Sequence, residues 1–252
     1  MTKPKALFEY LIRHADDTLI LGQRLSEWCG HGPILEEDIA LTNIALDLIG
    51  QATELYEYAA QVENKGRTAD DLAFLRLERE YKNVLLVEQK NGDFGKTIVR
   101  QFLFDNFQLL NYTQLLNSSD AQVAAIAEKS LKEVKYHLKH SSEWVIRLGD
   151  GTEESHQRIQ ESVDDLMRFV EELFFQNEVN ELLQEDKLIG DCEEFKQQFH
   201  QNINNILTEA TLTIPDIKYH QKGGRKGIHS EHMGFLLAEM QYMQRTYPGM
   251  QW

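Results

Sequence analysis

The chain has 252 residues, enough to bury a sizeable core in one large domain or two small ones. Its formal net charge of −15 argues against a nucleic-acid backbone or an anionic membrane as the main partner. The N-terminus lacks a signal-peptide core, and no apolar run reaches the roughly 18 residues of a membrane span, so we expect a cytoplasmic protein. Cys29 and Cys192 lie far apart and suggest neither a disulfide framework nor a zinc site.

Long proline-free stretches with helical periodicity fill most of the chain, and no convincing run alternates with a period of two. Apolar residues at steps of three and four predict helices over residues 6–29, 35–62, 69–81, 94–116, 121–148, 153–175, 179–185, 192–212 and 231–245, with an irregular segment over 213–230. Short connections between the long helices favour antiparallel neighbours in a bundle. The sequence therefore predicts a single all-α domain over residues 1–252.

The second predicted helix contains a near match to half of a di-iron site. Carboxylate-bridged di-iron bundles use a Glu from each of two helices and a Glu-x-x-His from each of two others. In the stretch Asp47–Gln51, the two ligand positions of such a motif hold Leu48 and Gln51. Leucine has no donor atom, and a glutamine amide is a poor iron ligand.

The other half-site is incomplete as well. The helix over 94–116 places Asp105 among its apolar positions, where a single carboxylate ligand would fit. The helix over 121–148 contains His137, but the residue three before it is Val134, and Glu133 is rotated by about 100° along the helix. We therefore expect a degenerate site without metal, in which Asp105 and His137 form a buried polar network, with Gln51 as a further candidate member.

Other residues also have the chemistry of metal ligands. Glu133, His137 and His140 share one helix face and could bind a transition metal, as some carboxylate and imidazole pairs do. In the first helix, Asp17 and Glu27 are ligand candidates by residue type, and His14 lies on the apolar stripe. The sequence has no nucleophile elbow, no phosphate-binding loop and no recognisable reactive cysteine, so no catalytic residue is assigned.

A glycine-rich basic segment precedes the last helix. Lys222, Arg225 and Lys226 bring positive charge into a very acidic chain, and Ser230 could cap the helix that follows. The three cations could hold a phosphate of a nucleotide-like ligand or dock an acidic partner surface. A solvated loop without a ligand is the alternative.

Several segments resemble one protein family. They are Arg24–Pro33, Asn43–Gln51, Leu86–Gln89, Gly223–His232, Leu237–Tyr242 and Pro248–Trp252. Together they resemble the C subunits of bacterial ring-1,2-phenylacetyl-CoA epoxidases, and the resemblance covers essentially the full chain.

This resemblance implies a ferritin-like helical bundle in a multicomponent monooxygenase of aerobic phenylacetate catabolism. In that family a paralogous A subunit contains the di-iron centre, and the C subunit lacks a functional metal site and serves as its structural partner. Reducing equivalents come from NADPH through a reductase component with FAD and an iron–sulfur cluster, and the substrate is phenylacetyl-CoA. With such a substrate, Lys222, Arg225 and Lys226 could contact coenzyme A phosphates; an interface with another subunit is the other role for this segment. An independently active di-iron oxygenase or ferroxidase is the alternative function.

Overall fold

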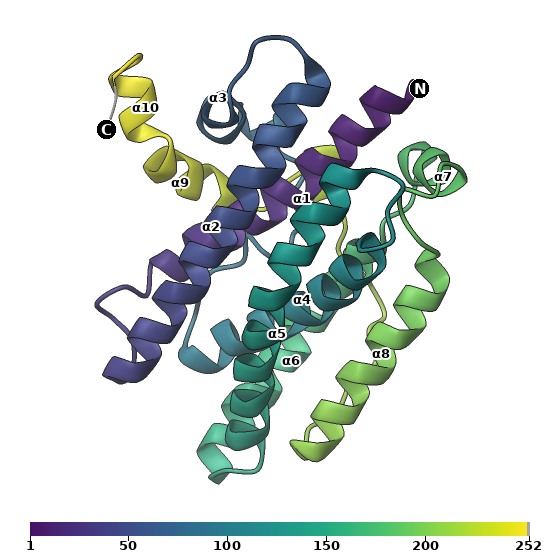
Figure 1. Cartoon of the computed structure of the whole chain (residues 1–252). Helices are drawn as coiled ribbons and strands as arrows, with labels where there is room; N and C mark the ends of the chain where they lie inside the picture. Colours follow the sequence, from purple (N-terminus) through teal and green to yellow (C-terminus); the bar gives the residue numbers. More distant parts are fainter. Residues whose placement is uncertain (251–252) are drawn as a thin grey trace. The chain divides into compact units, whose positions relative to one another are not determined.

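The computed structural model describes residues 1–250. Its α-helices are α1 (Lys3–Ser26), α2 (Leu35–Glu63), α3 (Ala69–Phe74), α4 (Phe94–Leu115), α5 (Ala121–Gly149), α6 (Glu153–Leu166), α7 (Glu178–Glu185), α8 (Cys192–Glu209), α9 (Glu231–Met240) and α10 (Tyr242–Thr246), joined in places by the 3-10 helices η1 (Glu78–Glu80), η2 (Met167–Phe174) and η3 (Gly224–Lys226) (Figure 1). No strand occurs within residues 1–250. The all-α prediction is confirmed, and the helices are consistent with a ferritin-like fold. The last two residues of the closing segment Pro248–Trp252 lie outside the described residues.

The described residues form two compact units, each assembled from separate pieces of the chain. The first unit contains Met1–Lys90, Asn177–Leu182 and the C-terminal part from Lys222 onward, and the second contains Asn91–Gln176 and Leu183–Gln221. The prediction of one domain over residues 1–252 stays a prediction. No helix of the described residues is long and apolar enough to cross a membrane.

The first unit is built on the pair α1 and α2, which pack against each other (Figure 1). Gly22 of α1 meets Ala45 and Leu48 of α2, whereas Asp16 meets Tyr56, so the two helices run antiparallel. A Cβ atom added to Gly22 would lie 3.2 Å from the carbonyl oxygen of Ala45. The absence of a side chain at this position therefore lets the two backbones approach closely.

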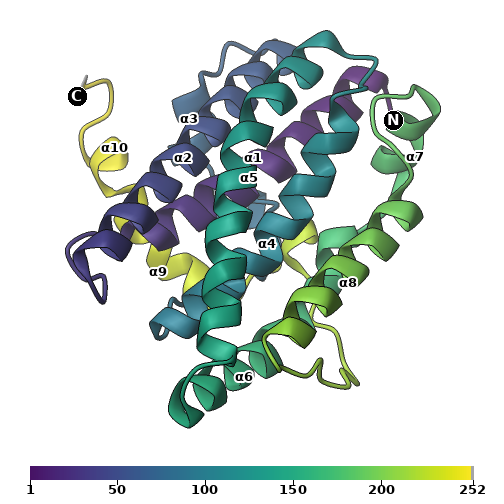
Figure 2. The ribbon, with the colours of Figure 1, turned by 60° about the horizontal axis from the view of Figure 1, so that its bottom comes forward.

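The second unit centres on α4, which packs against α5, α6 and α8; α4 and α5 lie side by side (Figure 2). Asp93 caps α4, because its Oδ1 accepts a hydrogen bond from the backbone N–H of Lys96 at 2.9 Å. Phe94 at the start of α4 meets Trp144 near the end of α5 edge-on, with ring centroids 5.1 Å apart, so these helices are antiparallel too.

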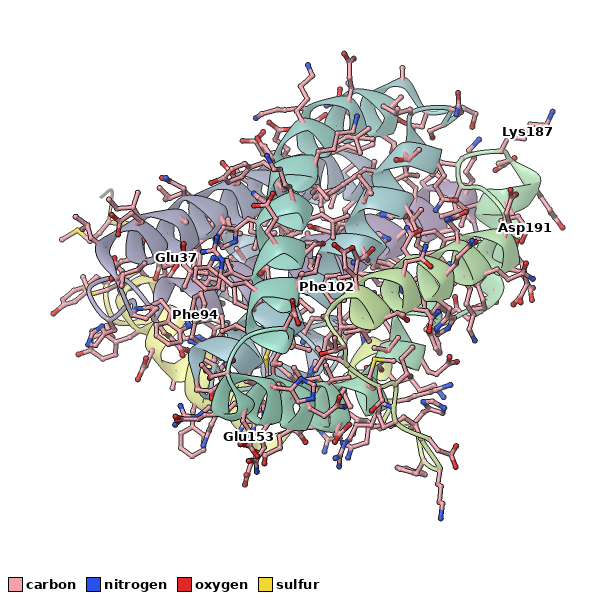
Figure 3. The ribbon with its side chains drawn as sticks, turned by 90° about the horizontal axis from the view of Figure 1, so that it is seen from below. Glu37, Phe94, Phe102, Glu153, Lys187 and Asp191 are labelled. Carbon is pink, nitrogen blue, oxygen red and sulfur yellow. The ribbon has the colours of Figure 1, made fainter. Side chains whose placement is uncertain are left out.

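Figure 3 shows the side chains of this arrangement from below, with Phe102 of α4 labelled, a residue fully buried in the core. Lys187 and Asp191 lie in the connection between α7 and α8 at the edge of the same view. Asp191 caps α8 by accepting a hydrogen bond from the backbone N–H of Glu193 at 2.8 Å.

Two predicted helices end early, at points where tertiary hydrogen bonds hold the following residues. The helix predicted over 69–81 ends at Phe74; beyond it, Arg76 forms an ion pair with Asp16, and the hydroxyl of Tyr81 donates to the carbonyl of Ala73. The helix predicted over 231–245 is interrupted at Gln241, whose side-chain amide donates to the carbonyl of Arg76 and the hydroxyl of Tyr81. Both lengths were therefore wrong.

Two further predicted helices are also shorter than expected. The helix predicted over 153–175 is α-helical only to Leu166 and continues as the tighter 3-10 helix η2. The helix predicted over 192–212 ends at Glu209, just before Thr211 takes a positive φ of 59°. The remaining predicted helices agree with the structure to within a few residues at each end.

Candidate functional site

The structure places Leu48 and Gln51 on the buried side of α2. Leu48 packs over Gly22 of α1: a Cβ atom at Gly22 would lie 3.4 Å from the Cβ of Leu48. Leucine therefore continues the apolar contact between α1 and α2 at the position where a di-iron motif would need a carboxylate. Burying an uncompensated carboxylate there would cost several kcal/mol, whereas a buried leucine stabilises by about 1.5–3 kcal/mol.

In the second unit, Asp105 of α4 lies in a buried polar cluster with residues of α5. Its Oδ1 accepts a hydrogen bond from Gln101 Nε2 at 2.6 Å, and its Oδ2 accepts one from Ser141 Oγ at 2.7 Å. Burial raises the pKa of Asp105 to about 6, and the nearby His137 side chain opposes this rise. A proton on Asp105 is therefore favoured by its surroundings far more than in water.

His137 and Val134 of α5 are both fully buried, one helical turn apart. The structure places Asp105, His137 and Val134 in the same unit. Gln51 and Leu48 belong to the other unit, so the membership of Gln51 in this polar network stays a prediction.

These residues do not fit a di-iron centre. Leu48 and Val134 offer no donor atom at two ligand positions, and both oxygens of Asp105 already accept hydrogen bonds. Each iron needs several oxygen or imidazole ligands. Within residues 1–250, no group of three or more His, Cys, Asp or Glu side chains is arranged to hold a metal ion, which also leaves the set Glu133, His137 and His140 without support. The metal-free prediction itself stays a prediction.

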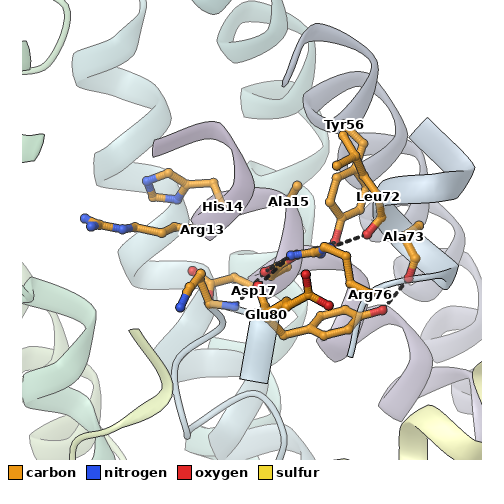
Figure 4. Close-up of polar contacts among 12 residues, drawn as sticks. Arg13, His14, Ala15, Asp17, Tyr56, Leu72, Ala73, Arg76 and Glu80 are labelled. Atoms are coloured by element: carbon orange, nitrogen blue, oxygen red, sulfur yellow. Dashed lines mark hydrogen bonds and ion pairs between the residues drawn. The ribbon is translucent and has the colours of Figure 1, made fainter. Parts of the chain in front are cut away.

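A second buried cluster, in the first unit, was missed at the level of sequence. Asp16 of α1 forms an ion pair with Arg76 and accepts a hydrogen bond from the hydroxyl of Tyr56 at 2.5 Å (Figure 4). The backbone N–H of Lys82 also donates to Asp16, at 2.6 Å. The hydroxyl of Tyr81 donates to the carbonyl of Ala73 at 2.5 Å. These contacts attach the segment after α3 to the middle of α1.

Asp17, the neighbour of Asp16, receives the guanidinium of Arg225. Arg225 Nη2 donates to Asp17 Oδ2 at 2.7 Å, and Nη1 donates to Asp17 Oδ1 at 3.0 Å. The backbone N–H of Val84 adds a hydrogen bond to the same carboxylate at 2.8 Å. Burial raises the pKa of Asp17 to about 6, against the opposing effect of Arg225. Asp17 is therefore part of an internal ion pair and is not placed as a metal ligand.

The three cations of the glycine-rich basic segment, Lys222, Arg225 and Lys226, do not lie on one surface. Arg225 is buried, whereas Lys222 and Lys226 are exposed. The grouping of all three as one phosphate-binding surface was therefore wrong for Arg225, because its guanidinium is committed to Asp17 inside the fold. A role for Lys222 and Lys226 at a phosphate or a partner stays a prediction.

The same segment is attached to Glu88 by a third set of contacts. His229 Nδ1 lies 2.8 Å from Glu88 Oε2, and the backbone N–H of Ser230 donates to Glu88 Oε1 at 2.6 Å. His229 Nε2 lies 3.1 Å from the carbonyl oxygen of Tyr81, so both ring nitrogens face acceptors. Burial lowers the pKa of His229, but the hydrogen bond with Glu88 and the charge of Glu88, together with the Tyr81 carbonyl and the Asp16 carboxylate, outweigh it, so the net shift of the pKa is upward. Arg24 then donates to the backbone carbonyl of Glu88 at 3.1 and 3.0 Å.

One signal in the sequence could have indicated this cluster. Asp16 and Asp17 stand next to each other within the long apolar pattern of the first helix, where carboxylates need cationic partners. Arg225, which stands between glycines in the segment predicted to be irregular, is one of the cations that could meet them.

We expect Asp105→Asn to change how stability depends on pH. The folded-state pKa of Asp105 is raised, so proton binding favours the fold: this contribution is complete below about pH 4 and is lost as the pH rises through about 6. An asparagine keeps the shape without the charge, so the variant should gain stability relative to the parent between about pH 4 and 8, by on the order of 3 kcal/mol. Urea unfolding at a series of pH values measures this. The exposed Asp216→Asn variant is the control; a difference for Asp105→Asn that stays constant with pH would contradict the prediction.

We expect Arg225→Met to lower the free energy of unfolding by about 3–5 kcal/mol, because it leaves the Asp17 carboxylate buried without its cation. The adjacent exposed Lys226→Met should change it by no more than about 0.5 kcal/mol. Adding Asp17→Asn to Arg225→Met should recover part of the loss, since no buried charge then remains. Chemical unfolding of the four proteins provides the measurement, and equal effects of the two methionine variants would disprove the structural role of Arg225.

Comparison with known proteins places the chain in a family. Residues 1–252 match the family described as phenylacetic acid catabolic protein. The chain is also 46% identical over 246 residues to the C subunit of the 1,2-phenylacetyl-CoA epoxidase of Escherichia coli (strain K12), a match that covers 98% of this chain and 99% of that relative. The resemblance carried by the segments from Arg24–Pro33 to Pro248–Trp252 is therefore confirmed. The chain belongs to the phenylacetic acid catabolic protein family.

Proposed function

We propose that this chain is the non-catalytic structural subunit of a phenylacetyl-CoA epoxidase and pairs with a di-iron catalytic A subunit. The observation that supports this most directly is the donor set at the former ligand positions. Leu48 and Val134 are buried hydrocarbon side chains where two carboxylates would be needed. The similarity to the C subunit of an epoxidase supplies the reaction to which such a scaffold would contribute.

A chain with this donor set has no means of activating oxygen by itself. Asp105 and His137 alone could not hold two iron ions. Under the proposal, oxygen chemistry and epoxidation of the aromatic ring take place in the A subunit. Electrons reach that subunit from NADPH through the reductase component with FAD and an iron–sulfur cluster. This chain then contributes a rigid surface that supports the catalytic subunit.

The buried ionic contacts of the first unit suit a supporting role. Asp16, Asp17 and Glu88 each hold a segment distant in sequence, namely the chain after α3 or the segment Lys222–Ser230. Satisfied buried networks of this kind favour one well-defined arrangement of the backbone. Exposed Lys222 and Lys226 remain candidates for contact with a coenzyme A phosphate or with an acidic surface of another subunit.

We expect the purified chain to retain far fewer than one iron per chain after anaerobic loading with Fe²⁺ and desalting, because the donor atoms are missing. The same treatment of the co-expressed A subunit should give about two irons per chain, as the di-iron class requires. Metal analysis of the two separated chains, and their co-elution before separation, test both halves of the proposal. Two irons bound to this chain alone would overturn it in favour of an independent di-iron oxygenase or ferroxidase.

Restoring one half-site should not restore iron binding. We expect the double variant Leu48→Glu and Gln51→His to stay below one iron per chain, since Val134 still lacks a carboxylate. It should also lose several kcal/mol of stability, because the introduced glutamate would be buried against α1. Leu48→Met conserves volume and is the control for packing. Stoichiometric di-iron binding by the double variant would show that Val134 is not the missing ligand position.

A further inference from the structure

The outer side of α2 exposes an uncharged surface. Going along the helix, the exposed positions include Leu35, Ile39, Asn43, Leu46 and Gly50, which follow one another at steps of three and four. Leu35 is 72% exposed, Ile39 52% and Leu46 62%. We call these five residues the α2 outer face. They span about 22 Å of helix at 1.5 Å per residue.

The contrast with α5 shows that this surface is unusual for the chain. Both helices are 29 residues long. The exposed side of α5 presents charge on almost every turn, at positions that include Glu128, Lys132, Lys135, Lys139 and Glu143. A helix that faces only water is expected to look like α5. The five residues of the α2 outer face carry no charge over more than three turns, and the exposed Glu36 lies at their edge, in a protein with a net charge of −15.

Gly50 indicates that another molecule packs closely against this face. A glycine inside a helix costs about 1 kcal/mol relative to alanine. Nothing among the described residues requires it, because a Cβ atom at Gly50 would meet no atom within 4 Å. By contrast, Gly22 lies beneath Ala45 and Leu48 and has a packing reason within the chain. The glycine at position 50 has a comparable packing reason if the backbone of another molecule packs against it.

The charges around the α2 outer face select its occupant. Helix α2 has no Lys, Arg or His, and its acidic residues are Glu36, Glu37, Asp38, Asp47, Glu54, Glu57 and Glu63. In a two-fold pairing of two copies through this face, acidic residues near the start of one α2 would oppose Glu54 and Glu57 of the other. Such a pairing brings like charges together and is unfavourable. The complementary surface is apolar at its centre and has Lys or Arg on its flanks.

We propose that the α2 outer face is the docking surface for the catalytic subunit, which packs an apolar helix against Ile39, Leu46 and Gly50 and places basic residues beside the acidic flanks of α2. This inference rests on the proposed function, since it names the surface through which the two subunits would pair. Central apolar contacts with oppositely charged flanks are the usual anatomy of a specific interface.

The first test introduces charge into the centre of this face. Leu46→Arg should weaken the affinity for the purified catalytic subunit by about 10-fold or more in isothermal titration calorimetry, because it buries an uncompensated charge and repels the basic flanks. Tyr136→Arg is the matched control: Tyr136 is 54% exposed on the charged side of α5, and its change should leave the Kd within about two-fold. Circular dichroism verifies that both variants are folded.

A second variant separates docking from folding. Gly50→Leu fills open space in the free chain and removes a helix-interior glycine, so Tm should rise by roughly 2–4 °C. The same leucine would collide with a closely packed partner, so the Kd should rise by about 10-fold or more. A gain in Tm with a loss of affinity is not expected from a purely structural role.

The outcomes distinguish the two proposals. If the parent chain binds the catalytic subunit and both Leu46→Arg and Gly50→Leu bind it equally well, the proposed function stands and the α2 outer face is the wrong surface. If the parent chain does not bind the catalytic subunit at all, the proposed function fails and this inference with it. Self-association of the parent in sedimentation velocity that Leu46→Arg abolishes would identify a second copy as the occupant and overturn the inference.

Discussion

Two adjacent buried carboxylates, Asp16 and Asp17, determine much of the structure of the first unit. A carboxylate without a partner in the protein interior costs several kcal/mol, so each must meet a cation or several N–H donors. Arg76 meets Asp16 and Arg225 meets Asp17. Because these arginines lie 60 and 208 residues further along the chain, satisfying two positions in α1 fixes the path of two distant segments.

The need of Asp16 and Asp17 for hydrogen-bond and ionic partners also explains local features that helix propensity does not explain. The chain after α3 leaves the helical path so that the N–H groups of Lys82 and Val84 can reach Asp16 and Asp17. Gly224 beside Arg225 comes so close to the carbonyl of Asn83 that a Cβ atom there would collide with the backbone. The glycine-rich segment is therefore shaped by an internal ion pair, and only its lysines remain at the surface.

The second unit satisfies its buried carboxylate by other means. Asp105 accepts hydrogen bonds from an amide and a hydroxyl, and no arginine or lysine forms an ion pair with it among the described contacts. Its pKa is therefore set mainly by burial. Helix α2 buries the hydrocarbon side chain of Leu48 on its inner side and exposes that of Leu46 on its outer side.

The sequence by itself determined the all-α class, the ends of the long helices and the absence of donor atoms at positions 48 and 134. These properties follow from periodicity and residue type, which are local. It also predicted that Asp105 and His137 would be buried, because both interrupt apolar stripes. Only the tertiary structure decided that Arg225 is buried, that the helix beginning at Ala69 stops at Phe74, and that Gly50 has open space above it. Each of these depends on which distant segment lies opposite, and a linear pattern of charges and apolar residues contains no information on that pairing.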